Sequence, residues 1–295
     1  MRFAVRLAGR AALFAVGLNL VGPALAAENA VERGVYLVRA AGCTSCHTDA
    51  KNEGERFAGG RALKTPFGVY YSPNITPDKV TGIGAWSDGD FLAALQQGLN
   101  PDGSHYFPVF PYTTYTRMRD EDALAIKAYL FSLKPVRRAN TPHAVSMPFN
   151  WRWTMGIWKW LYFEPGRFRF DPEADETLRR GAYLVEALAH CGECHTPRNF
   201  AGAVDREMWM AGTVDGPEGE IAPNITPDPE TGIGNWSEGD IVTLLKDGLK
   251  PDFDDVQGLM SEAIRDGLKD LPETDLKAIA RYLKSLPAIE HKVGK

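Results

Sequence analysis

The chain has 295 residues, 24% of them charged, and a formal net charge of −5, and this length is sufficient for two domains of ordinary size. Its acidic balance argues against binding to nucleic acid and favours docking to a partner with a basic patch. The two motifs described below use all 4 cysteines, so none remains for the disulfide framework that an exported chain could carry.

The first 26 residues are predicted to be a cleaved signal peptide. Arg2, Arg6 and Arg10 form a positive region, residues 11–20 are apolar, and Ala24-Leu25-Ala26 is a small-x-small cleavage site. A retained membrane anchor is the alternative, but the apolar run is short beside the ~20 residues that a spanning helix needs. Cleavage would remove three arginines and no acidic residue, which changes the formal charge from −5 to −8.

Each half of the chain contains a Cys-x-x-Cys-His motif, the pattern that attaches a c-type haem. The copies are Cys43-Thr-Ser-Cys46-His47 and Cys191-Gly-Glu-Cys194-His195. A two-residue spacing lets one helical turn present both sulfurs to one porphyrin edge, and the next residue can offer its imidazole to the iron. Zinc is the alternative, but each half has only weak candidates for a fourth ligand. The sequence therefore predicts two covalent haems.

An internal repeat surrounds the two motifs. The segments 33–38, 73–78 and 81–87 of the first half recur as 180–185, 223–228 and 231–237 of the second. The chain is thus two copies of one unit, each with its own haem. We expect domains at 27–140 and 176–295, joined by an aromatic-rich linker at 141–175.

Each unit is predicted to consist of three helices with long loops and hardly any strand. The first helix covers roughly 31–40 or 178–189, before the cysteines. The second follows a capping box that begins at Ser87 or Ser237 and ends near a glycine. The third covers 122–133 or 276–283, where apolar residues recur at helical spacing and a proline follows. The predicted fold class is all-α, with loops that wrap a haem in place of a larger protein core.

The segment 147–163, which lies in the expected linker, is rich in tryptophan. Its Arg152, Lys159 and Pro148 exclude a simple spanning helix. We interpret it as packing between the two domains, since aromatic clusters more often mark packing, and a surface for a membrane or a partner is the alternative.

A methionine thioether is the usual second axial ligand of an electron-carrying c-type haem. In the second unit Met260 is predicted in this role, in a loop before the last helix. In the first unit, alignment of the final helices places Met118 opposite Leu271, and residues 107–111 occupy the place where a ligand is expected. Met118 is nevertheless the only methionine between the first motif and the last helix of its unit, so it is the predicted ligand.

Other side chains remain as alternatives or neighbours of the haems. His105 is the rival ligand for the first iron, because a neutral imidazole also binds iron, and an open or unusual site is the third alternative. His190 is expected to face solvent or a haem propionate. Arg198 is expected either to pair with a propionate or to be solvated.

These residues resemble a family. Both motifs, Phe110-Pro-Tyr112, the two Thr-Gly-Ile-Gly-x-Trp-Ser segments and the Tyr-Leu pairs of the final helices are similar to those of bacterial dihaem c-type cytochromes. The chain looks like the cytochrome subunits of periplasmic or membrane-bound alcohol, sugar and aldehyde dehydrogenases. Those subunits commonly carry three such units, and this chain has two. The resemblance implies two tandem class I cytochrome c domains.

The predicted function is electron transfer rather than catalysis. The resemblance implies a redox protein as partner, a periplasmic location that allows peripheral association with the membrane through a complex, and a quinone, oxidase or soluble cytochrome of the respiratory chain as acceptor. The alternative is a dihaem enzyme that reduces peroxide or oxidises sulfur compounds, with one open or displaceable axial site and with His105 and Arg117 as polar groups. The lack of a spare cysteine weakens the sulfur version.

Overall fold

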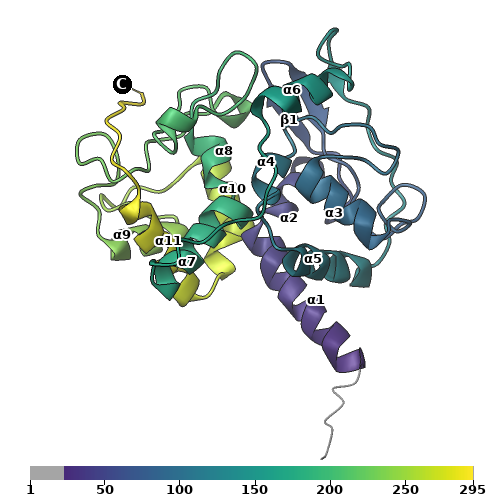
Figure 1. Ribbon diagram of the computed structural model, residues 1–295, viewed down its shortest axis with the longest axis horizontal. Coiled ribbons are helices and arrows are strands. Elements are labelled where there is room, and N and C mark those ends of the chain that lie inside the picture. The colour runs from purple at the N-terminus through teal and green to yellow at the C-terminus, as the bar shows by residue number, and fades with distance from the viewer. Residues whose placement is uncertain (1–22, 295) are drawn as a thin grey trace, which may run out of the picture.

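The computed structural model describes residues 23–294, and Figure 1 shows its two groups of helices side by side. The predicted signal peptide falls mainly on residues 1–22, outside the described residues. Its last residues, 23–26, belong to the first turns of helix α1 (Pro23–Ala40). The prediction of cleavage therefore stays a prediction.

In both repeats the first and last helices cross at close range. α1 packs on α5 (Asp120–Ser132), and α7 (Glu176–Tyr183), which continues as a π-helix over Leu184–Leu188, packs on α11 (Glu273–Ser285). A Cβ built on Gly34 would lie 2.1 Å from the carbonyl oxygen of Ala125, and one on Gly181 would lie 1.9 Å from that of Ala278. The glycine of the repeated Arg-Gly-x-Tyr segment is therefore what permits this crossing.

The predicted second helices are confirmed, with their caps. α3 (Asp88–Gln97) and α9 (Glu238–Asp247) both begin with a complete capping box, at Ser87 and Ser237. Both end at a glycine in the left-handed region, Gly98 with φ 61° and Gly248 with φ 75°.

Five shorter helices complete the helical part of residues 23–294. Among them, the sequence predicted a helical turn only for the two that carry the Cys-x-x-Cys-His motifs. They are α2 (Cys43–His47), α4 (Tyr112–Tyr115), α6 (Thr154–Tyr162), α8 (Cys191–His195) and α10 (Gly258–Asp266), and four 3₁₀ turns lie at Ala50–Asn52, Arg206–Met208, Pro217–Gly219 and Leu268–Asp270. The expectation of a loop at Met260 was wrong, because Met260 lies in the first turn of α10.

A small antiparallel sheet departs from the all-α prediction. Its strands are β1 (Ala62–Thr65), β2 (Gly68–Tyr71) and β3 (Ala144–Val145), in the order β1-β2-β3. The turn Thr65–Gly68 makes a hairpin of the first two, with Ala62 opposite Tyr71. Strands this short carry no readable alternation, so their period was not visible in the sequence.

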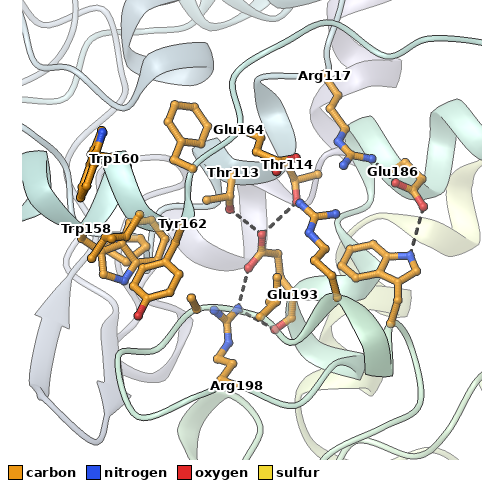
Figure 2. Close-up of a pocket in the computed structure, with 17 residues that line it drawn as sticks. Thr113, Thr114, Arg117, Trp158, Trp160, Tyr162, Glu164, Glu186, Glu193 and Arg198 are labelled. Atoms are coloured by element: carbon orange, nitrogen blue, oxygen red, sulfur yellow. Dashed lines mark hydrogen bonds and ion pairs between the residues drawn. The ribbon is translucent and has the colours of Figure 1, made fainter.

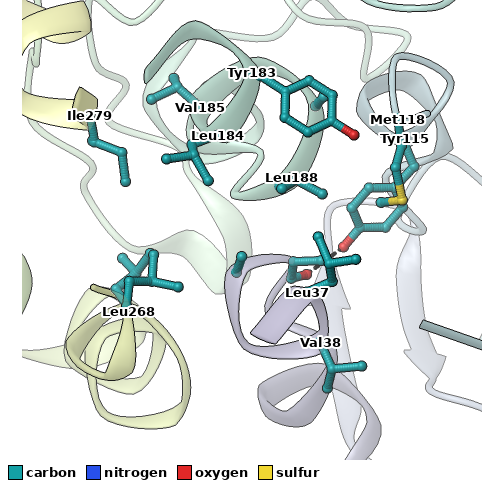
Figure 3. Close-up of a cluster of buried hydrophobic side chains, with 14 of the residues drawn as sticks. Leu37, Val38, Tyr115, Met118, Tyr183, Leu184, Val185, Leu188, Leu268 and Ile279 are labelled. Carbon is teal, nitrogen blue, oxygen red and sulfur yellow. Dashed lines mark hydrogen bonds between the residues drawn. The ribbon is translucent and has the colours of Figure 1, made fainter. Parts of the chain in front are cut away.

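The largest core cluster joins both repeats rather than filling each one separately. It includes Leu37 and Met118 from the first repeat together with Leu184 and Leu188 from the second. Figure 3 shows these side chains converging between the helices. Contiguous apolar packing across the repeats means that their relative position is set by burial, not by a flexible connection.

The aromatic segment only partly packs as predicted. Trp158 of α6 is buried and its indole N–H donates to the carbonyl of Ala201 at 2.9 Å. Trp153 and Trp160, in contrast, are 62% and 83% exposed. Several of their apolar neighbours are also exposed. In the part of the chain that the structure describes, no helix has the length and apolar character needed to cross a bilayer.

Candidate haem sites

The first Cys-x-x-Cys-His motif forms helix α2, which begins after Gly42 in the left-handed region at φ 64°. The Nδ1 atom of His47 lies 2.8 Å from the carbonyl oxygen of Pro73. That oxygen can only accept, so Nδ1 carries the proton and Nε2 keeps its lone pair for a metal. Burial lowers the pKa of His47, which keeps the imidazole in the neutral form that binds iron.

The second motif forms helix α8 with the same arrangement. It begins after His190, which has φ 45°, and the Nδ1 atom of His195 lies 2.8 Å from the carbonyl oxygen of Pro223. Burial lowers the pKa of His195 as well. Both repeats thus present a neutral imidazole whose Nε2 is the free ring nitrogen, the form suited to an iron ligand.

The repeated Pro-Asn-Ile-Thr segment explains how each histidine is held. The side-chain oxygen of Asn74 accepts from the amide of Thr76 at 2.9 Å, and its NH₂ group donates to the carbonyl of Val136 at 2.7 Å. Asn224 makes the same bonds to Thr226 and Ile289, at 2.9 and 2.8 Å. These turns fix the carbonyls of the prolines that precede them, so the repeated segment positions the two histidines.

The four cysteines fit covalent attachment rather than a disulfide. All are free thiols that are partly buried. Burial raises the pKa of Cys43, Cys191 and Cys194 to about 12 and also raises that of Cys46. Each pair lies on one short helix whose last residue is the oriented histidine. The donor set of two thiols and one imidazole is that of a haem c, whose vinyl groups the thiols would hold as thioethers.

The two methionines predicted as axial ligands occupy different environments. Met260 is partly buried in α10 and packs against the large core, and the amide of its neighbour Leu259 donates to Glu220 at 2.8 Å. Met118 has 0% exposure and belongs to the core itself. The axial role of both residues remains a prediction.

The polar residues singled out near the haems are engaged elsewhere. Arg198 pairs with Glu193 of the second motif at 2.5 Å. Arg117 pairs with Glu186, which also accepts from the Trp209 indole at 3.1 Å. Figure 2 shows these two ion pairs on the wall of a cavity between the repeats, beside aromatic side chains of the segment 158–163.

Glu193 ties the second motif to the first repeat. Its carboxylate accepts from the hydroxyls of Thr113 at 2.6 Å and Thr114 at 3.0 Å. Burial acts to raise the pKa of Glu193, but the Arg198 guanidinium and the Thr113 hydroxyl outweigh it and lower the pKa overall. The carboxylate is therefore charged inside the interface and anchors α8 to helix α4.

Arg61 makes the reciprocal connection from the first motif to the second repeat. Its guanidinium donates to the carbonyl of Ser45, inside α2, at 2.8 Å, and to Glu262 of α10 at 2.5 Å. It also pairs with Glu218 at 3.1 Å. The interaction links the first attachment helix to the helix that carries Met260.

The residues that precede the two attachment motifs meet. A Cβ built on Gly42 would lie 3.3 Å from Nε2 of His190, so the residues that precede the two first cysteines are in contact. The His190 ring also stacks edge-on against Tyr115, with ring centroids 5.8 Å apart. His190 was expected to face solvent or a propionate, and the structure instead places it at the interface between α2 and α8.

Comparison with known proteins agrees with this donor set. The chain is 44% identical to a diheme cytochrome c-type protein of Cereibacter sphaeroides over 88% of this chain and 86% of that protein. The chain belongs to the dihaem c-type cytochromes. Residues 31–134 also match the family model for cytochrome c. The chain therefore carries two covalent haem c groups, at Cys43 and Cys46 and at Cys191 and Cys194, and it is an electron-transport protein rather than an enzyme.

Longer relatives are subunits of dehydrogenases. The chain is 42% identical to the fructose dehydrogenase cytochrome subunit of Gluconobacter japonicus, over 90% of this chain and 54% of that protein. It is 39% identical to the cytochrome c subunit of a quinone alcohol dehydrogenase of Gluconacetobacter polyoxogenes, over 93% of this chain and 61% of that protein. This cytochrome thus spans a little over half of the length of these subunits.

Sequence reasoning missed the residues that join the two sites. Arg61 and Glu193 were not singled out, and neither were Thr113 and Thr114, which follow the segment 107–111 that was considered for an iron ligand. Their contacts pair residues distant in the sequence, so no local pattern could reveal them. The only available signal was Glu193 itself, a charged residue inside a motif that buries its cysteines.

Proposed function

We propose that this cytochrome is exported to the periplasm, where it passes electrons from a dehydrogenase to an acceptor of the respiratory chain. The observation that carries the proposal is the contact between Gly42 and His190, which brings the two attachment helices together. Electron transfer between haems falls steeply with distance, so adjoining attachment sites favour transfer from one haem to the other.

A bound haem c supplies a one-electron couple between Fe(II) and Fe(III). In this proposal His47 and His195 would bind the irons through Nε2, since Pro73 and Pro223 hold their Nδ1 protons. Met260 would bind the second iron through its thioether, a ligand that favours the reduced state. The first cysteine of each motif, Cys43 or Cys191, packs against the apolar core around α1 and α7.

We assign the dehydrogenase contact to the exposed aromatic segment between the repeats. Trp151, Trp153 and Trp160 are 43%, 62% and 83% exposed, next to the exposed Ile157 and Leu161. Exposed aromatic and aliphatic side chains gathered in one segment are typical of a protein interface. The named relatives are subunits of fructose, alcohol and gluconate dehydrogenases, and this supports a catalytic subunit as the occupant.

Reduction by dehydrogenases tests the proposal. The holoprotein is mixed with the separated catalytic subunits of fructose, alcohol and gluconate dehydrogenases, each with its own substrate, and haem reduction is followed by absorbance. We expect at least one subunit to reduce both haems, and Trp153→Ser with Trp160→Ser to slow that reduction without changing the haem spectra. Failure of all three donors would contradict a dehydrogenase donor of this class. Recovery of the protein from the cytoplasmic instead of the periplasmic fraction would contradict export.

A further inference from the structure

The backbone after α3 and the backbone after α9 follow the same path. An isolated bridge pairs Leu99 with His105 in the first repeat and Leu249 with Asp255 in the second. The amide that follows each bridge donates to the glycine that ends the helix, at 2.8 Å from residue 106 to 98 and at 2.9 Å from 256 to 248. In these four pairs the residue number of the second repeat is that of the first plus 150, so the structure sets this register for residues 98–106 and 248–256.

Extended by four residues beyond the last of these pairs, this register makes Phe110 the counterpart of Met260, since 110 plus 150 is 260. Both side chains are partly buried and pack against the large core. Further on, Met118 corresponds to Leu271, at an offset of 153. If the offset between the repeats rose from 150 towards 153 before residue 110, Met260 would align with a residue of the segment 107–109. That segment also contains no methionine. The ligand position of the second repeat therefore has no methionine counterpart in the first.

Met118 fills the role of a core leucine instead. It is 0% exposed, its counterpart Leu271 is 5% exposed, and both belong to the large core cluster at the entrance to the last helix of their repeat. Figure 3 shows Met118 beside Tyr115, among the side chains that close the interface between the repeats. The backbone carbonyl of Met118 accepts from Gln96 at 3.3 Å, which fixes this turn.

His105 is also committed elsewhere. Its Nδ1 lies 3.0 Å from the ammonium nitrogen of Lys159. Its Nε2 faces helix α6, where a Cβ built on Gly156 would lie 3.3 Å away. Both ring nitrogens are thus directed at the segment between the repeats, and the counterpart of His105 in the second repeat is Asp255, which is not at the methionine position.

We propose that the first haem iron has no protein side chain as its sixth ligand, and that Phe110 leaves this position open to a small ligand such as carbon monoxide or cyanide. The proposal rests on the haem attached at Cys43 and Cys46 and on His47 as its only axial ligand from the protein. The second iron, with Met260, is closed. The two haems of this cytochrome thus differ in ligation although their attachment motifs are alike.

Titration of the reduced holoprotein with carbon monoxide tests the proposal, with a pyridine haemochrome assay to count haems and circular dichroism to verify folding. We expect one carbon monoxide bound for every two haems. Met118→Leu, which copies Leu271, should leave this ratio unchanged. Phe110→Met should abolish binding and strengthen the methionine-to-Fe(III) charge-transfer band, and Met260→Leu should raise the ratio to one for each haem.

A wild-type protein with two haems that binds no carbon monoxide would overturn the proposal. If Met118→Leu or His105→Gln then began to bind it, the replaced residue would be the sixth ligand. Binding that Phe110→Met does not diminish would also contradict the role of Phe110. These results are independent of reduction by a dehydrogenase, so the open site and the electron-transfer partner fail or succeed separately.

Discussion

Tyr36 and Tyr183 form a reciprocal exchange of hydrogen bonds, because the hydroxyl of each binds a carboxylate of the other repeat. The Tyr36 hydroxyl of the first repeat donates to Asp275 of the second at 2.7 Å, and the Tyr183 hydroxyl of the second donates to Asp122 of the first at 2.6 Å. Each carboxylate is also held by the arginine of its own repeat, Asp275 by Arg180 at 2.8 Å and Asp122 by Arg33. In the repeated Arg-Gly-x-Tyr segment, the arginine therefore binds the aspartate of its own repeat and the tyrosine binds that of the other repeat, and Arg180 also donates to the Tyr36 hydroxyl at 2.7 Å.

Removal of either exchanged hydroxyl should destabilise the protein. Tyr36→Phe and Tyr183→Phe each leave a buried carboxylate short of one donor, which costs about 1–3 kcal/mol. Denaturant unfolding of the holoprotein measures the loss, and Tyr162→Phe, at a side chain that is 37% exposed, is the control. A loss equal to that of the control would show that the exchange does not hold the repeats together.

The Tyr183 bond should also make stability depend on alkaline pH. Burial, together with the Asp122 carboxylate, raises the pKa of Tyr183 from 10.0 to about 12. Its contribution is therefore fully present below pH 10, where the unfolded tyrosine is still protonated, and it is lost as the pH rises towards 12. We expect the free energy of unfolding to fall over this window, and to fall less steeply in Tyr183→Phe. Equal slopes in both proteins would contradict the assignment.

The helix crossings should not tolerate a methyl group. Gly34→Ala and Gly181→Ala place a Cβ 2.1 Å and 1.9 Å from backbone carbonyl oxygens, which forces the helices apart at a cost of about 1–3 kcal/mol. Gly89→Ala in α3 is the matched control, because its Cβ would meet only the Ser87 hydroxyl at 3.7 Å. There the higher helix propensity of alanine should give a gain of up to ~1 kcal/mol. Thermal unfolding measures the stability of the three variants. A Gly34→Ala protein as stable as the control would refute the close crossing.

Loss of Arg61 should lower the reduction potential of the first haem. Arg61→Met removes a positive charge that binds the Ser45 carbonyl inside α2, and it leaves Glu218 and Glu262 without their partner. A site with less positive charge favours Fe(III), so we expect a decrease on the order of tens of millivolts. Potentiometric titration of the visible spectrum measures it.

Arg265→Met is the control for the Arg61 variant, because Arg265 is 54% exposed and, among residues 23–294, forms one ion pair, with Asp266 at 2.8 Å. Its potential should equal that of the wild type, since exposed pairs are screened by solvent. An unchanged potential in Arg61→Met would mean that Arg61 acts on the packing of the repeats alone.

The sequence by itself determined the haem chemistry and the repeat. Cysteine and histidine spacing is a local property, and the capping boxes at Ser87 and Ser237 and the glycine stops are set within a few residues, so these features could be read directly. The three helices of each repeat follow from apolar periodicity for the same reason. The short strands, and α6 and α10, lack a comparable local signal.

Only the tertiary structure decided how the repeats work together. The exchange of Tyr36 and Tyr183, the contact of Gly42 with His190 and the bond of Arg61 to Glu262 join residues from opposite halves of the chain. Such contacts depend on how two apolar faces pack, which no local pattern encodes. The same packing buried Met118 in the core that joins the repeats, a position that the sequence alone did not show.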